Sequence, residues 1–214
     1  MKTLQSNLSI WAMAALLSSG SLAACAQATT GTTAATTTSD PAKTTLLTPL
    51  QQSITKLKKL AATGDPDFDY CFQAKAHTQG TQELLKAEIQ NGKDTTMVNM
   101  AKAMLPAVDA DIAMFDGTMR QLKPTRPSQA FTQQQNRNIE AMSLKLQQTG
   151  SSDKLTGNLD KNFATLLLDQ QQDAIDMANT YLQYGNNASL KTYAQQMVDK
   201  SRQQMTTLKA QQPK

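Results

Sequence analysis

His77 is the only imidazole in the chain, so any site that needs a nitrogen ligand or an imidazole base depends on it. Thioether sulfur suits Cu(I), and nine of the 11 methionines follow residue 24. Three of them are spaced three and four residues apart, as a helix spaces the side chains of its core face. We therefore favour core packing. The alternative is a Cu(I) site that combines His77 with some of the following: Met97, Met100, Met104, Met177 and Met197.

The sequence lacks the residues that di-iron, nucleophilic or phosphate-binding sites require. A di-iron helical bundle uses Glu-x-x-His pairs, and Ala74 stands where the glutamate before His77 would be. The sequence has no Gly-x-Ser-x-Gly segment around a nucleophile and no glycine-rich phosphate loop. Cys71 is expected to pack as a small apolar side chain. We therefore predict that the protein is not an enzyme.

The elements that position these residues are predicted to be helices. Only 9 glycines and 7 prolines occur in 214 residues, and no alternating strand pattern competes. Capping residues before the apolar runs and glycines after them indicate six helices. They are expected over about 48–62, 66–91, 95–123, 129–148, 159–184 and 188–209.

The chain matches itself at an offset of 93 residues. The identities include Asp67 with Asp160, Gln79 with Gln172, Gly92 with Gly185 and Met104 with Met197. Each half is interpreted as one helical hairpin, with repeat one over 67–120 and repeat two over 160–208. Two hairpins predict an all-α four-helix bundle, because a lone hairpin cannot cover its apolar face. The helices at 48–62 and 129–148 are then additions to that bundle.

Polar residues near the histidine predict a network inside the bundle. Glu83 and Asp176 occupy equivalent positions of the repeat, which favours a shared structural role. We expect them to anchor a network with Asp111 and Gln170. A lone histidine is commonly hydrogen bonded to a carboxylate, here Glu83 or Asp111, which makes His77 part of the same network.

The N-terminus is predicted to be a sorting signal. Lys2 precedes an apolar stretch over 8–17, which is too short for a bilayer span of about 20 residues. The segment Leu22-Ala23-Ala24-Cys25 is typical of the lipobox of bacterial lipoproteins. We therefore expect residues 1–24 to be a cleaved lipoprotein signal peptide and Cys25 to carry the lipid.

Composition then divides the remainder into a tether and one domain. Residues 26–45 contain nine threonines and no large apolar side chain, so 25–46 is predicted to be a disordered tether and 47–210 a single helical domain. A lipidated cysteine followed by Ala26 favours the outer membrane. The expected location is the cell envelope, facing the periplasm, or secretion if Cys25 is not lipidated.

The charge balance excludes one class of partner. Lys and Arg number 21 against 17 Asp and Glu, and no basic run exceeds the pair Lys58-Lys59. This density is far below that of a nucleic-acid-binding protein. The expected partners are a membrane, reached through the lipid, and an envelope protein held in an apolar groove. The oligomeric state is left open.

Two segments resemble the family known as domain of unknown function 305. They are His77-Thr78-Gln79-Gly80, which leads to Gly92, and Gln170 to Ala178, which contains Ala-Ile-Asp-Met-Ala and leads to Gly185. The resemblance implies a ferritin-like bundle of two similar hairpins in envelope or secreted proteins. It also implies a metal site at a pair of histidines in each repeat, with copper linked to some members.

One imidazole stands where that family pattern has four. His77 keeps the first position, whereas Thr78, Gln170 and Gln171 replace the other three. Amide and hydroxyl groups are weak ligands for copper or zinc. The leading hypothesis is therefore a non-catalytic envelope lipoprotein, a binding or stress-accessory module with a degenerate metal site. The alternatives are a copper-binding or copper-tolerance protein and a structural protein that holds a partner.

Overall fold

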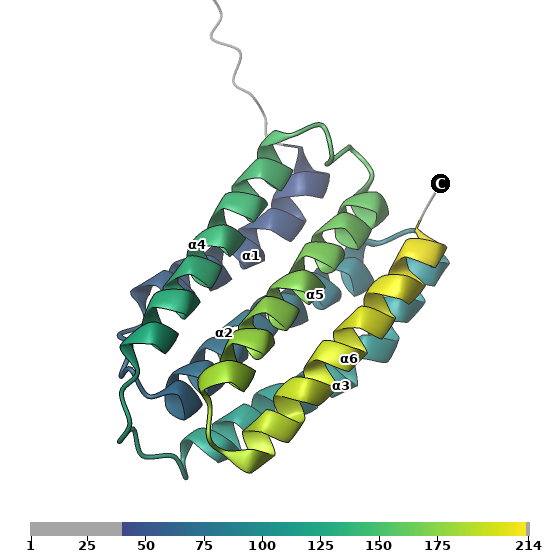
Figure 1. The fold of residues 1–214 in the computed structure, drawn as a ribbon. Helices are drawn as coiled ribbons and strands as arrows, with labels where there is room; N and C mark the ends of the chain where they lie inside the picture. The colour runs from purple at the N-terminus through teal and green to yellow at the C-terminus, as the bar shows by residue number, and fades with distance from the viewer. Residues whose placement is uncertain (1–39, 213–214) are drawn as a thin grey trace, which may run out of the picture. The chain divides into compact units, whose positions relative to one another are not determined.

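A computed structural model describes residues 40–212 of the chain. This part is all-helical, as predicted, and contains no strand. Its six helices are drawn in Figure 1. They are α1 (Pro41–Lys59), α2 (Pro66–Asn91), α3 (Thr95–Met119), α4 (Gln129–Ser151), α5 (Leu159–Tyr184) and α6 (Ala188–Gln211). None of these helices is long and apolar enough to cross a membrane.

Short polar side chains begin the helices, as the sequence indicates. Asp65, Asp94, Ser128 and Asn187 each accept a hydrogen bond from a backbone N–H of the helix that they precede. These bonds satisfy donors that have no partner within the helix. The cap of α5 is Asn158, whose side chain accepts from the N–H of Lys161.

The first helix begins earlier than predicted, at Pro41, so it includes the last residues that were assigned to the tether. The Asp40 side chain accepts from the N–H of Ala42 at 2.9 Å, and Pro41 stands at the first helical position. Leu46, assigned to the tether, is fully buried. Pro49 lies near the predicted helix start at residue 48, but in the structure it is inside α1. The predicted signal peptide, the predicted lipidation site Cys25 and the predicted tether up to residue 39 lie outside the described residues.

In the view of Figure 1, α4 overlaps α1, α5 overlaps α2 and α6 overlaps α3. The central helices α2 and α5 pack against each other, with α1 on α2 and α4 on α5. On the opposite side α3 packs on α2 and α6 packs on α5. Both central helices are buried on opposite faces, which explains their many buried residues.

The repeat is larger than the predicted hairpin. Each half supplies three helices in the same order, so the helices predicted at 48–62 and 129–148 are equivalent outer helices and not unrelated additions. The turn before each central helix also repeats. Asp69 accepts from the N–H of Thr63, and Asn162, 93 residues later, accepts from the N–H of Thr156. The sequences of the two outer helices, α1 and α4, differ, so the comparison of the chain with itself did not reveal this correspondence.

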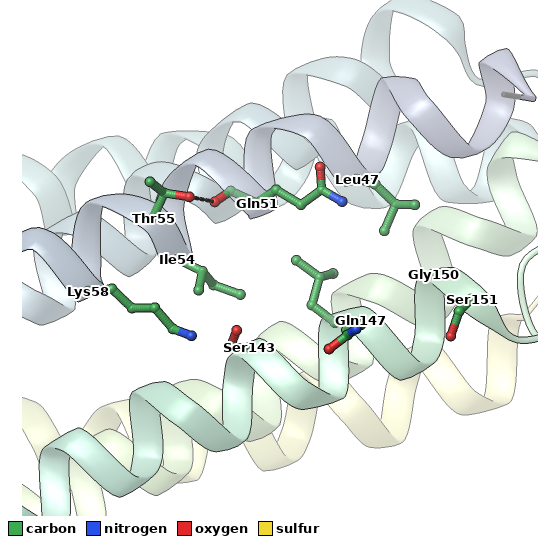
Figure 2. A pocket seen from close by; sticks show the side chains of 10 residues that line it. Leu47, Gln51, Ile54, Thr55, Lys58, Ser143, Gln147, Gly150 and Ser151 are labelled. Carbon is green, nitrogen blue, oxygen red and sulfur yellow. Dashed lines mark hydrogen bonds between the residues drawn. The ribbon is translucent and has the colours of Figure 1, made fainter. Parts of the chain in front are cut away.

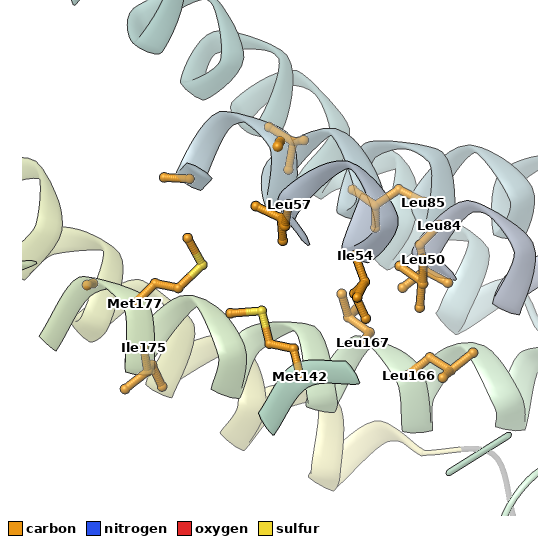
Figure 3. Close-up of a cluster of buried hydrophobic side chains, with 14 of the residues drawn as sticks. Leu50, Ile54, Leu57, Leu84, Leu85, Met142, Leu166, Leu167, Ile175 and Met177 are labelled. Atoms are coloured by element: carbon orange, nitrogen blue, oxygen red, sulfur yellow. The ribbon is translucent and has the colours of Figure 1, made fainter. Parts of the chain in front are cut away.

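Apolar side chains fill the space between the helix pairs. Figure 3 shows leucines of α1 and α2 facing leucines and methionines of α4 and α5. At one end of the central pair, Tyr70 and Tyr181 stack with ring centroids 4.2 Å apart. Because these rings lie at opposite ends of their helices in sequence, the central helices are antiparallel. The middle of this pair is the place where the two repeats meet.

Candidate binding cavity between the two repeats

A small cavity lies among the four helices α2, α3, α5 and α6. Its volume is about 40 Å³, which is room for a few water molecules or one ion and too little for an organic substrate. The residues that line it are His77, Thr78, Thr81, Met104, Val108, Asp111, Gln170, Gln171, Ala174, Met197, Lys200 and Gln204.

The lining is arranged as equivalent pairs from the two repeats. At the offset of 93 residues the pairs are His77 with Gln170, Thr78 with Gln171, Thr81 with Ala174, Met104 with Met197 and Asp111 with Gln204. The cavity therefore lies where the two halves meet. The positions at which the resemblance implies histidine pairs converge there from α2 and α5.

His77 is buried on α2, with 6% of its surface exposed. Its Nε2 atom has no hydrogen-bond partner among residues 40–212. Burial, assisted by the positive charge of Lys145, lowers the pKa of His77 from 6.5 to about 4. The ring is therefore neutral at physiological pH. The ring does not donate the predicted hydrogen bond from Nε2 to the carboxylate of Glu83 or Asp111.

Polar contacts organise the walls on both sides of the histidine. The Thr81 hydroxyl donates to Oε1 of Gln170 at 3.2 Å and so joins α2 to α5. Across the cavity, Nζ of Lys200 on α6 lies 3.5 Å from Oδ2 of Asp111 on α3. Burial raises the pKa of Asp111, and Lys200 partly offsets that effect. The cavity thus has one weak ion pair in its wall.

The structure brings some of the predicted metal residues together and separates others. His77, Met104 and Met197 line the same cavity. Met97 and Met177 are buried in the core away from it, which fits the packing interpretation. Met100 lines a separate cleft between α3 and α6. Within the described part of the chain, no group of three or more His, Cys, Asp or Glu side chains could hold a metal ion.

The four residues of the predicted polar network lie in different places. Asp111 and Gln170 line the cavity, where Asp111 pairs with Lys200 and Gln170 accepts from Thr81. Glu83 does not reach it, because it is exposed and forms an ion pair with Lys86 one turn along the same helix, at 2.8 Å. Asp176 accepts a hydrogen bond from Gln172 of its own helix and is likewise absent from the cavity. Equivalent positions of the repeat therefore carry these two acids on outer surfaces of the central helices.

Another buried polar network, around Asp67 and Asp160, was not predicted from the sequence. Asp67, at the start of α2, accepts from the Tyr181 hydroxyl at 2.7 Å and from the N–H groups of Asn186 and Asn187. At the equivalent position Asp160 accepts from the N–H groups of Lys93 and Asp94, both at 2.8 Å. Asp67 of α2 thus clamps the turn between α5 and α6, and Asp160 of α5 clamps the turn between α2 and α3.

The two clamps differ in the side chains around their aspartates, and Arg126 pairs with Asp67 at 2.6 Å. Where one has Tyr181, the other has Glu88, again 93 residues apart. Glu88 is fully buried, and burial together with the nearby Asp160 raises its pKa to about 8. Its carboxyl group therefore keeps a proton at neutral pH. The identity of Asp67 and Asp160 in the repeat was the signal available in the sequence.

Each clamp also explains the glycine that follows it. Gly92 has a φ of −66° and so does not take the left-handed conformation expected of a C-terminal glycine. A Cβ atom there would lie 2.5 Å from Oε1 of Glu88. At Gly185 a Cβ would collide with the ring of Tyr181. Close packing of the preceding turn, not backbone conformation, requires glycine at both positions.

Two further features, Cys71 and a groove between α1 and α4, do not bring several reactive side chains together. Cys71 is buried, its thiol donates to the Phe115 carbonyl, and burial raises its pKa to about 12, so it packs as predicted. A groove of about 460 Å³ lies between α1 and α4, and Leu146 is among the residues that line it. Figure 2 shows Ile54 and Lys58 on the α1 side of this groove. Its remaining walls are mostly uncharged amide and hydroxyl groups.

Comparison with known proteins agrees with the repeated helices. A family model described as Domain of unknown function (DUF305) matches residues 109–211, which run from the second half of α3 to the end of α6. No curated protein and no solved structure matches the chain. The match includes the whole second repeat, with Gln170, Met197 and half of the cavity wall. Residues 109–211 therefore belong to the DUF305 family.

Proposed function

We propose that the protein is a non-catalytic metal-binding protein of the bacterial cell envelope that holds Cu(I) in the cavity between its repeats. The observation that carries this proposal is the lining of one 40 Å³ cavity. It contains the only histidine of the chain, with a buried and unpartnered Nε2, and the two equivalent methionines Met104 and Met197. This function adopts the copper alternative raised by the sequence.

The donor set fits Cu(I) better than harder ions. Thioethers select soft ions, and a neutral imidazole completes a ligand set of one nitrogen and two sulfurs. Because the pKa of His77 is about 4, no proton has to leave the ring before a metal binds at neutral pH. Thr78 and the two glutamines at the other histidine positions do not supply the four nitrogens that Cu(II) or Zn(II) would favour.

Charge near the cavity also favours a monovalent cation. All three donors are neutral, so the bound ion keeps its charge in a buried place. Asp111 lies in the wall and is only weakly paired with Lys200, at 3.5 Å. Because Lys200 lines the same cavity, the charges of the wall sum to zero without an ion. A divalent ion would therefore bring twice the charge of Cu(I) into this buried space and cost more to bury.

The envelope location rests on the lipobox-like segment that ends at Cys25. A lipid at this cysteine, followed by a threonine-rich segment, would hold the bundle near a membrane surface. The exposed surface gives less support to the structural alternative. Among the described residues Leu144 is the one large apolar side chain that is exposed, at 49%.

The proposal is tested by titrating the purified protein with Cu(I), without oxygen, against a chelator of known affinity. The informative variant is Met104→Leu combined with Met197→Leu, which preserves side-chain volume and removes both sulfurs. Met97→Leu is the matched control, because Met97 lies on the same helix as Met104 but outside the cavity. A His77→Leu variant removes the nitrogen ligand.

We expect one Cu(I) per chain, with at least about 100-fold weaker binding in the double methionine variant and in His77→Leu. Met97→Leu should bind as the unchanged protein does. Equal binding by the double variant and the unchanged protein would overturn the proposed site. Circular dichroism spectra of all variants establish that each is folded before its affinity is compared.

A further inference from the structure

A second cavity lies next to the first, in a cleft between α3 and α6. Its volume is about 350 Å³, within the range of small-molecule sites in proteins. Both helices supply residues to the lining of this cleft, and each packs mainly on its own central helix. The cleft shares Met104, Gln171, Lys200 and Gln204 with the wall of the central cavity. Nothing in the proposed copper function uses it.

Small side chains keep this cleft open. Ala103 and Ala107 face it from α3, whereas Met100, Leu167 and Leu208 form apolar walls. Leu167 and Leu208 are each 1% exposed, so these walls are fixed parts of the core. The cleft is therefore an apolar space with a rigid floor from α5.

The other half of the α3 and α6 pair is closed. There the rings of Phe115 and Tyr193 meet edge to face at 5.1 Å, and Asp111 pairs with Lys200. Lys200 therefore stands at the inner end of the cleft, where it meets the central cavity. It is the single charged residue in the cleft lining.

We propose that this cleft binds an aliphatic carboxylate, with the carboxylate at Lys200 and the chain along Ala103 and Met100. The apolar walls provide the burial that an alkyl chain needs, and one cation at the inner end selects an acid over an alcohol. The amide groups of Gln171 and Gln204 stand beside Lys200 and offer N–H donors to a carboxylate. The lysine reaches such a ligand readily because its pairing to Asp111 is long.

Seven residues separate Met100 from Ala107, which corresponds to a rise of about 10 Å along α3. An alkyl chain of medium length matches this span. Each additional methylene that enters the cleft should strengthen binding about fourfold, since its burial contributes a fixed free energy. The cavity therefore predicts a dependence on chain length that ends when the cleft is filled.

The test measures binding of hexanoate, octanoate, decanoate and decanol to the purified, copper-free protein by calorimetry, below the concentrations at which they aggregate. Lys200→Gln should weaken decanoate binding about tenfold and leave decanol unchanged. Ala107→Phe fills the cleft and should abolish binding of both ligands. Lys191→Gln on the same helix is the charge-matched control and should change neither, because it lies outside the cleft.

Two results would overturn the proposal: decanoate that fails to bind, or binding that Ala107→Phe leaves intact. Loss of decanoate and decanol binding in equal measure in Lys200→Gln would overturn the assignment of the lysine. The double methionine variant separates this proposal from the copper function. It should lose Cu(I) and keep decanoate, because leucine at residue 104 preserves an apolar wall.

Discussion

Replacing Glu88 by glutamine should raise the stability of the protein at alkaline pH. Glu88 is fully buried beside Asp160, and burial together with that carboxylate raises its pKa from 4.5 to about 8. The protonated acid can donate a hydrogen bond to Asp160. Glutamine has nearly the same shape and donates through its amide, but it has no proton to lose.

The direction of the effect follows from proton binding in the two states. Between pH 4.5 and about pH 8 the folded protein keeps the Glu88 proton, whereas the unfolded chain has released it. Stability therefore falls as pH rises through this window, and it is constant with respect to this group above the window. Asp160 makes no contribution there, because its pKa is lowered and it is ionised in both states.

The size of the effect follows from the same values. At about 1.4 kcal/mol for each pKa unit, a pKa raised from 4.5 to about 8 corresponds to at most about 5 kcal/mol. The pair lies at the ends of two helices, where nearby solvent weakens charge repulsion. We expect Glu88→Gln to gain about 3 kcal/mol at pH 9 and close to nothing at pH 5.

The assay is urea denaturation followed by circular dichroism at pH 5, 7 and 9. Glu83→Gln is the matched control, since it removes the same charge from an exposed position of the same helix. That control should change stability by less than about 1 kcal/mol at every pH. The reasoning is refuted if Glu88→Gln and the unchanged protein lose stability in parallel between pH 5 and pH 9.

Three further predictions concern the opposite clamp and the histidine. Gly185→Ala should destabilise the protein by about 2 to 3 kcal/mol in thermal unfolding, because its Cβ would meet the Tyr181 ring, whereas Gly117→Ala has 3.8 Å of space and should be neutral or stabilising. Tyr181→Phe should cost about 1 to 2 kcal/mol in urea, since Asp67 loses a buried donor at 2.7 Å; an unchanged midpoint would contradict this. Cu(I) affinity should change less than twofold between pH 7 and pH 5, because the pKa of His77 is about 4. A ligand histidine with an ordinary pKa of 6.5 would lose about 25-fold over the same range, which competition titrations would detect.

Local signals in the sequence predicted most helix boundaries. Asp65, Asp94, Ser128 and Asn187 cap helices because a short polar side chain can reach the free N–H groups of the first turn. The start of α1 was predicted too late, although Asp40-Pro41 carries the same signature as Asp65-Pro66. The threonine-rich residues around Asp40 concealed this signal, because the cap involves only the Asp40 side chain and the backbone two residues later.

The candidate site was harder to predict, because helical spacing does not say which helix a face meets. Met97, Met100 and Met104 share one stripe of α3, yet one is core, one lines the cleft and one reaches the cavity. Which methionine faces His77 depends on how α5 and α6 pack, and both helices are more than 50 residues after Met104 in sequence. Only the repeat could have paired Met104 with Met197, since it relates positions that meet across the bundle.

The pseudo-symmetry explains how the centre of the bundle can lose ligands while the fold persists. Asp67 and Asp160 hold the ends of α2 and α5, through backbone N–H groups that do not depend on the side chains of the turns they clamp. The central layer, in contrast, is joined by one side-chain hydrogen bond, from Thr81 to Gln170. We expect conservative substitutions there to cost less stability than loss of Asp67 or Asp160, because those aspartates hold the helices at their ends. The cavity is therefore the part of this fold in which ligand chemistry can change most freely.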